Sequence, residues 1–211
     1  NGTPTAALIA GGYSPSTDAS EKYNGTSWTE GNNLGTARYD ISGGGTQTAG
    51  IMVGGEPPAT GKTETYDGSS YTEVADLNSA RSRRFAGAGT QTDMLVFGAA
   101  IPGSASASGA TESFNGTAWT EVNDLNTARW GHSGFGRTGE TAMSAGGDPA
   151  SAVTEDFDGV SWTEVADLGT GRGYKAGFGT ETLGLVGGGY PNNVVLTEEW
   201  TMPQNVKIIT D

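Results

Sequence analysis

Short stretches in which hydrophobic and polar residues alternate recur along the chain, and they form one long pattern present in four copies. The segment TESFNGTAWTEVNDLNTAR at 111–129 has close copies at 20–38, 63–81 and 154–172. Successive copies are separated by 43, 48 and 43 residues. A period of this size is typical of supersecondary units that are stacked or arranged radially.

Each copy is predicted to form a β-hairpin. An Asn-Gly or Asp-Gly pair separates two alternating stretches, which is typical of a two-residue loop with positive φ at both residues. In the first copy this loop is Asn24-Gly25, and Glu21 would then face Trp28 across the hairpin. The constant Glu, aromatic, Thr and Trp residues would share one face. That face must be buried against a neighbouring unit, because an isolated hairpin is only marginally stable in water.

Two further strand patterns complete the unit. A glycine-rich stretch follows each Ala-Arg pair, and an apolar stretch ending in small residues precedes each Glu-x-aromatic stretch. The apolar stretches are AALIAGG at 6–12, GIMVGG at 50–55, MLVFGA at 94–99, AMSAGG at 142–147 and LGLVGG at 183–188. Glycine-rich strands suit a crowded innermost position, and the Trp-Thr-Glu strand suits the outer edge, where its Glu discourages edge pairing. The unit therefore has four short strands, and no helical period is present.

The order of these features resembles the kelch repeat, whose units are the blades of a β-propeller. The resemblance covers residues 6 to about 200 and consists of the glycine pair, the Glu-x-Tyr/Phe strand, the Trp and the Ala-Arg pair. The unit is shorter than the ~50 residues usual for kelch. Asn/Asp-Gly turns replace a longer Asp-Pro-type turn, and Gly98-Ala99 replaces one glycine pair. The segments NGTSWTE at 24–30 and TEVNDLNTAR at 120–129 are also similar to kelch-like segments in structural proteins of marine tailed bacteriophages.

We therefore predict an all-β fold, a small β-propeller of about five four-stranded antiparallel blades with kelch-like repeats of 43–48 residues. The repeats would occupy 1–203, with partial first and last blades, and 204–211 would form a C-terminal closing strand. The patterns account for 18 strands where five complete blades need 20. The segment VKIIT at 206–210 would either complete the last blade or close the ring.

Charge and composition restrict the partners. The net charge is −13, and 14 of the 24 acidic residues recur at repeat positions, so most of the charge belongs to the architecture. We expect no nucleic-acid partner, because no basic stripe is present, and no membrane insertion, because the longest apolar runs are strand-sized. The absence of cysteine excludes disulfides and thiolate chemistry. The chain begins within a repeat unit, so a leader could lie upstream.

The sequence contains no strong pattern of catalytic residues. His132 is the only histidine, so a catalytic triad would have to be built around it, and a histidine-cluster metal site is excluded. Glycosidases need two carboxylates, but the acids recur once per unit and the off-register acids select no pair. No Ser-x-Asp-x-Gly-x-x-Trp box typical of sialidase propellers is present. We expect a protein that is not an enzyme and uses no cofactor and no metal.

A buried ion pair is predicted within each unit. A constant spacing of 17 residues separates Glu21 from Arg38, Glu64 from Arg81, Glu112 from Arg129 and Glu155 from Arg172. A carboxylate on the buried face of the hairpin needs a partner, because a desolvated and unpaired charge is costly.

The candidate binding residues are those that follow each repeat Arg, because they differ from unit to unit. They are Tyr39, Arg83, Arg84, Trp130, His132, Tyr174 and Lys175. In a kelch-like blade they would share a face with the variable loops at 13–20, 56–62, 100–110, 148–153 and 189–196. Aromatic and arginine side chains are enriched in interface hot spots and stack on sugars. Two alternatives stay open: these residues fill the channel mouth and touch only one another, or the loops vary for lack of constraint.

The phage resemblance implies a binding or structural module of a virion, such as a tail appendage or a decoration. Its partner would be a host-surface glycan or protein, or another virion protein, and its location would be the virion. The alternatives are a glycan-processing enzyme on the same scaffold and an intracellular kelch-type interaction adaptor. The oligomeric state and the ligand are left open by the sequence.

Overall fold

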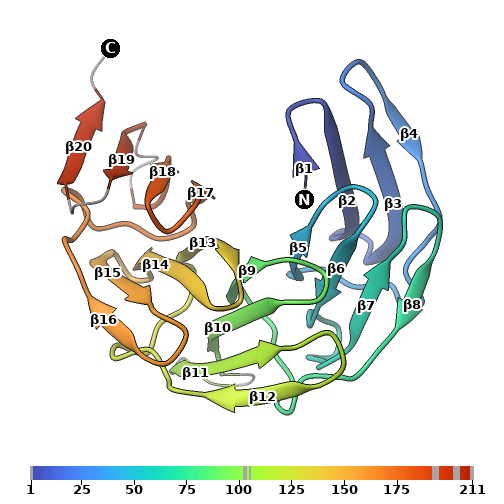
Figure 1. Cartoon of the computed structure of the whole chain (residues 1–211), viewed down its shortest axis with the longest axis horizontal. Coiled ribbons are helices and arrows are strands. Elements are labelled where there is room, and N and C mark those ends of the chain that lie inside the picture. The colour runs from blue at the N-terminus through green and yellow to red at the C-terminus, as the bar shows by residue number, and fades with distance from the viewer. Residues whose placement is uncertain (1, 102–103, 105, 192–194, 202–204, 210–211) are drawn as a thin grey trace.

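The protein is an all-β propeller. The computed structural model describes residues 2–101, 104, 106–191, 195–201 and, for the backbone, 205–209. These residues contain no helix and form five four-stranded antiparallel sheets. The sheets are arranged radially as five blades (Figure 1), which confirms the predicted fold class and blade count.

Every blade is one contiguous segment with four strands. Blade 1 contains β1 (Gly2–Thr3), β2 (Ala6–Gly12), β3 (Thr17–Tyr23) and β4 (Trp28–Glu30). Blade 2 contains β5 (Ser42–Gly45), β6 (Gly50–Val53), β7 (Thr63–Tyr66) and β8 (Tyr71–Glu73). Blade 3 contains β9 (Ala86–Gly89), β10 (Met94–Ala100), β11 (Ala107–Phe114) and β12 (Trp119–Val122). Blade 4 contains β13 (Ser133–Thr138), β14 (Thr141–Gly147), β15 (Ser151–Phe157) and β16 (Trp162–Glu164). Blade 5 contains β17 (Ala176–Gly179), β18 (Leu183–Gly187), β19 (Thr197–Thr201) and β20 (Asn205–Ile209).

The glycine-rich strand lies innermost, as predicted. In each sheet the strands follow chain order, and the first strands β5, β9, β13 and β17 contact one another in succession. The space there is small, since a Cβ atom added at Gly134 would lie 2.7 Å from the Cβ atom of Ala86 in the neighbouring blade. Glycine at these positions lets the inner strands approach closely.

The last blade is complete. β20 pairs with β19 as the outermost strand, which is the first of the two places that the sequence left open for this segment. Thr210, which the predicted strand included, lies outside the described residues, and so do residues 204 and 211. The division at residues 203 and 204 stays a prediction.

The outer hairpin loop is longer than predicted. Tyr23 pairs with Trp28, so the loop contains four residues, and Gly25 has positive φ whereas Asn24 does not. The Asn24 Oδ1 atom accepts hydrogen bonds from the backbone N–H groups of the two residues before Trp28, at 2.9 and 3.0 Å. This side-chain turn fixes the loop without a left-handed conformation at Asn24. The two-residue loop was therefore wrong.

The longer loop changes which residues face each other across the hairpin. Glu21 faces Glu30 and not Trp28. The aromatic residues of the two strands face each other, and the ring centroids of Phe114 and Trp119 are 5.0 Å apart. The Glu, the aromatic residue and the Trp still share one face, as predicted, because the Glu and the aromatic residue are two apart on one strand.

Most of the core lies between blades. One cluster joins Ile51 and Val53 of blade 2 to Val96, Phe114 and other residues of blade 3. The outer-strand tryptophans also donate hydrogen bonds to the preceding blade. The Trp119 Nε1–H group donates to Thr63 Oγ1 at 3.1 Å, and that of Trp162 donates to Thr111 Oγ1 at 3.2 Å.

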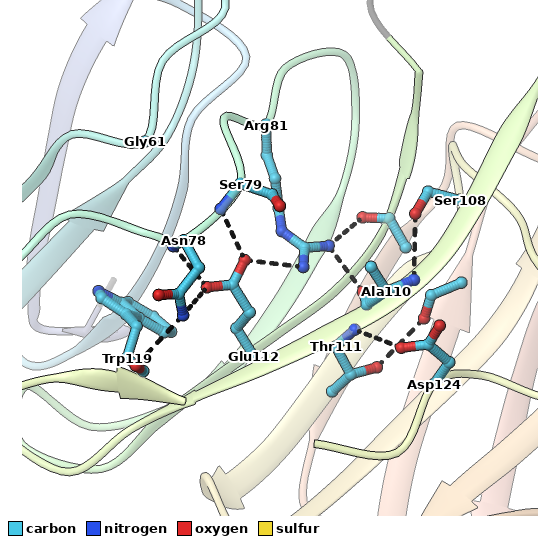
Figure 2. A network of polar contacts seen from close by, with 12 residues as sticks. Gly61, Asn78, Ser79, Arg81, Ser108, Ala110, Thr111, Glu112, Trp119 and Asp124 are labelled. Atoms are coloured by element: carbon cyan, nitrogen blue, oxygen red, sulfur yellow. Dashed lines mark hydrogen bonds and ion pairs between the residues drawn. The ribbon is translucent and has the colours of Figure 1, made fainter. Parts of the chain in front are cut away.

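The repeat Arg pairs with the Glu of the next blade, so the prediction of a pair within one unit was wrong. The Arg81 Nη2 atom lies 3.1 Å from Glu112 Oε1 (Figure 2). The backbone N–H groups of Asn78 and Ser79 donate to the same carboxylate. The remaining pairs are Arg38 with Glu64, Arg129 with Glu155 and Arg172 with Glu198. The connector from Leu to Arg thus leaves its own blade and wraps around a buried carboxylate of the following one.

The inner turns make a second link between blades. The Gln47 side-chain amide donates to the carbonyl groups of Ala7 and Tyr23 in the preceding blade, at 2.9 and 2.6 Å. Gln91 makes the same bonds one blade further on. Glu181 occupies this position in blade 5, and its Oε2 atom is buried without a hydrogen-bond partner. A carboxylate cannot donate the hydrogen bonds that the amide donates.

Candidate binding site

A cavity of about 810 Å³ opens on the face where the connectors and the variable loops meet. Its lining residues come from blade connectors and from the loops after the glycine pairs. They are Tyr13, Tyr39, Asp40, Glu56, Arg83, Arg84, Ala100, Ser104 and Trp130. We refer to this region as the mouth. Four of the seven candidate residues from the sequence lie here: Tyr39, Arg83, Arg84 and Trp130.

Backbone pairing between blades positions these side chains. The connector of one blade pairs with the loop of the next, and Tyr39 and Glu56 exchange two backbone hydrogen bonds of 2.9 and 3.0 Å. Ser82 bridges to Ala100, and Gly173 bridges to Tyr190, in the same way. The mouth is therefore carried on hydrogen-bonded segments, which hold its residues in fixed positions.

The position two residues after each repeat Arg has a left-handed backbone. The φ angles there are 52° at Asp40, 55° at Arg83, 64° at Gly131 and 54° at Tyr174. Glycine adopts this conformation without cost and aspartate tolerates it, whereas arginine and tyrosine adopt it at a cost of order 1 kcal/mol or more. Three of the four units nevertheless carry a large or charged side chain. The connector to blade 3 also has one extra residue, Arg84, whose φ is 67°.

Aromatic rings and a guanidinium group form a contiguous set at the mouth. The Arg84 guanidinium carbon lies 4.1 Å from the centroid of the Tyr174 ring. Trp130 and Tyr190 contact the same ring edge to face, with centroid distances of 5.8 and 6.0 Å. Burial raises the pKa of the Tyr174 hydroxyl, and Arg84 opposes this shift. Tyr174 thus joins the mouth through its contacts with Arg84 and Trp130.

Charged groups of both signs are present. The Arg83 Nε atom is 3.7 Å from Glu56 Oε1, and more than half of the Arg83 side chain is exposed. This ion pair is long and solvated, so it contributes little stability. The guanidinium group can therefore donate hydrogen bonds to a ligand carboxylate, hydroxyl or carbonyl oxygen.

The other two candidate residues lie in the interior. His132 packs against Phe97, with ring centroids 5.5 Å apart, and only 7% of it is exposed. Burial, with Arg129 and Lys175 nearby, holds the His132 pKa well below its usual value. Lys175 is also buried, and its ammonium group donates to the Arg172 carbonyl oxygen at 2.7 Å. Neither side chain lines the cavity, and both pack beneath the connectors.

The sequence analysis missed two aromatic residues of this face. Tyr13 contacts Tyr39 edge to face at 4.7 Å, and Tyr190 contacts Tyr174. Each of these tyrosines directly follows a glycine pair, in the first and in the last unit. A search for aromatic residues at that position would have found both.

No protein-family model matches the chain, and no curated protein matches its sequence. In the described part of the chain, no group of three or more His, Asp and Glu residues could hold a metal ion. Among the same residues there is also no helix with the length and apolarity needed to cross a membrane.

Proposed function

We propose that the protein is a non-enzymatic, kelch-like binding module that contacts its partner through the mouth. The observation that carries this proposal is the set of left-handed connector positions with Asp40, Arg83 and Tyr174 in place of glycine. Strained backbone persists where the surrounding structure holds it, and it clusters at ligand contacts. Large, unlike side chains at these positions indicate a requirement for the side chains themselves.

The partner that this surface suits best is a host-surface glycan or a protein. Aromatic faces stack on sugar rings, and guanidinium groups supply directed donors. Trp, Tyr and Arg are also the residues most enriched in interface hot spots. The repeat sequences are similar to kelch-like segments of phage structural proteins. This similarity supports a virion component, such as a tail appendage or decoration, that contacts a host glycan or another virion protein.

A purely structural role is the second candidate. The observation that favours it is the contact of Arg84 and Trp130 with Tyr174, because these side chains already cover part of one another's surface. In that case the mouth residues would cap the channel and contact no ligand.

Binding of purified bacterial envelope glycans and of a glycan array to the wild type tests the proposal. The wild type is compared with a folded Trp130→Ala, Tyr174→Ala double variant. We expect the double variant to bind at least about 10-fold more weakly, since hot-spot aromatics each contribute about 2 kcal/mol or more. Trp28→Ala is the matched control, because Trp28 is 46% exposed and does not line the mouth, and its binding should be unchanged. Equal binding by the double variant would refute the site. No binding of the wild type to any of these glycans would refute a glycan partner, which leaves a partner protein or the structural role.

A further inference from the structure

A second hollow lies on the flank of blade 1 that faces away from blade 2. It is a groove of about 330 Å³, lined by Ile9, Gly11, Thr17, Ala19, Glu21 and Glu30. In the other blades the equivalent face is covered by the preceding blade and its connector. The propeller is open at this point, since blades 1 and 5 stand apart in Figure 1.

Among the side chains that the structure describes, the large apolar residues of this flank are exposed only in blade 1. Ile9 is 49% exposed, whereas Met52 at the same position of blade 2 is 4% exposed. Trp28 is 46% exposed, whereas its equivalents Trp119 and Trp162 are 6% and 5% exposed. These residues have the chemistry of a junction between blades without a neighbour to cover them.

The polar part of the junction is also unpaired. Glu21 is exposed and makes no ion pair with the described residues, whereas each of its four equivalents holds an Arg of the preceding blade. The incoming Arg normally lies against the second residue of the glycine pair. A Cβ atom at Gly189 would lie 3.0 Å from Arg172 Cδ, and one at Gly147 would lie 3.4 Å from Arg129 Cδ. A Cβ atom at Gly12 would meet only its own loop.

The flank of blade 5 shows the complementary deficit. Leu185 is 36% exposed, although the equivalent Leu95 and Met143 are fully buried. Phe178 is 62% exposed, whereas Phe135 at the same position of blade 4 packs against blade 5 and is 5% exposed. Blade 1 therefore lacks the preceding blade that would cover its flank, and blade 5 lacks the following blade that would cover its own.

We propose that the groove of blade 1 binds the Leu-x-x-Ala-Arg connector of one further repeat unit, which occupies the opening between blades 5 and 1. The Arg pairs with Glu21 and lies over Gly12, and the Leu packs on Ile9. The Trp28 indole donates to the Thr that directly precedes the Glu on the third strand of that unit, as Trp119 donates to Thr63 and Trp162 to Thr111. The inner strands of the same unit cover Leu185 and Phe178.

A second copy of the described chain does not supply this connector. All four repeat arginines, Arg38, Arg81, Arg129 and Arg172, are already paired within the propeller. A copy docked on the groove would bury Glu21 without a cation, which is strongly unfavourable. An additional unit with its own Arg is the occupant that matches both the apolar and the charged part of the groove.

A fusion that adds one unit tests this proposal. A copy of residues 86–134 is joined directly before Asn1, which brings its connector to the groove with the inner strand in register. Glu21→Gln is then made in the fusion and in the original chain. We expect this change to lower the Tm of the fusion by about 6 °C or more and that of the original chain by less than about 2 °C.

The matched control is a second fusion in which the Arg of the added unit is replaced by Ala. It retains the added strands but cannot form the ion pair, so Glu21→Gln should no longer lower its Tm and should raise it, because the change removes a buried carboxylate that has no cation. The proposal is overturned if Glu21→Gln has the same effect in the fusion and in the original chain. It is also overturned if the original chain forms a dimer at micromolar concentration that Glu21→Gln or Trp28→Ala dissociates, because the occupant would then be a second copy.

Discussion

Replacement of Arg129 by Ala tests the link between blades most directly. Arg129 is 2% exposed and its partner Glu155 is fully buried. The Arg129 Nη1 atom also donates to the Val153 carbonyl oxygen at 2.6 Å. After the substitution, Glu155 retains only the amide donors of Asn126 and Thr127 from the connector. The carboxylate then remains buried without a cation.

We expect Arg129→Ala to lower the free energy of unfolding by about 3–5 kcal/mol, the usual cost of removing one partner of a buried pair. For a chain of this length that corresponds to a fall in Tm of about 6–20 °C. Burial lowers the pKa of the Arg129 guanidinium and the surrounding acids raise it, but the group stays charged over the usable pH range. The stability loss should therefore be nearly independent of pH above the carboxylate range.

Urea unfolding followed by tryptophan fluorescence measures this loss. Trp162 reports on the same junction, because its ring packs against those of Phe157 and Phe97, with centroid distances of 5.1 and 4.7 Å. Arg83→Ala is the matched control, since Arg83 is exposed and its contact is weak, and it should change the stability by less than about 0.5 kcal/mol. A loss below about 1 kcal/mol for Arg129→Ala would refute the view that the pair holds the blades together.

Three other substitutions give further tests. Glu181→Gln should stabilise the protein by about 1–2 kcal/mol at pH 7, because the amide can donate the two interblade hydrogen bonds that the carboxylate cannot donate. Thermal unfolding measures this gain, and a lower Tm would contradict the expectation. Burial, with Asp158 and Glu181 nearby, raises the Asp156 pKa to about 6. The folded state therefore holds this proton more tightly than the unfolded state, so the contribution of Asp156 to stability is lost as the pH rises from about 4 through 6. Asp156→Asn should remove this loss in unfolding experiments at pH 4 to 7, and a parallel profile would contradict the assignment. Burial, with Arg172 and Arg129 nearby, lowers the Lys175 pKa to about 7, so the unfolded state binds the extra proton and stability should rise between about pH 7 and 10. Lys175→Met should abolish this rise, and an unchanged pH profile would show that the ammonium group is solvated.

The four-strand unit and its stacking could be predicted from the sequence because both depend on local patterns that recur. The partner of each Arg could not. In a repeat, the Glu of one unit and the Glu of the next are equivalent in sequence, and the spacing of 17 within a unit is constant. The true spacing is 26 for Arg129 and Arg172 but 31 for Arg81, because the loop of blade 3 is longer and the connector before this blade has one extra residue. Because the loops differ in length, the spacing between each Arg and its Glu in the next blade is not constant, and the sequence pattern did not reveal this ion pair.

The sequence could also indicate the connectors that carry the candidate binding residues, but it could not show which of these residues line the cavity. Variability after each Arg indicated the connectors, several of which line the cavity, because side chains there are not part of the repeated core. It could not separate Trp130, which lines the cavity, from His132 two residues later, which points into the interior. That distinction depends on the left-handed residue between them, Gly131, whose conformation turns the chain inward. A single sequence shows such a residue only where it is glycine.

The contiguity of each blade has a consequence for synthesis on the ribosome. No described blade borrows a strand from a distant part of the chain, so each sheet can form as soon as its own segment of about 40 residues has emerged. The connector with its Arg emerges before the Glu that it will hold, and it is therefore ready when the next blade appears. Because the contacts between blades join neighbouring units, assembly can advance one blade at a time from the N-terminal side.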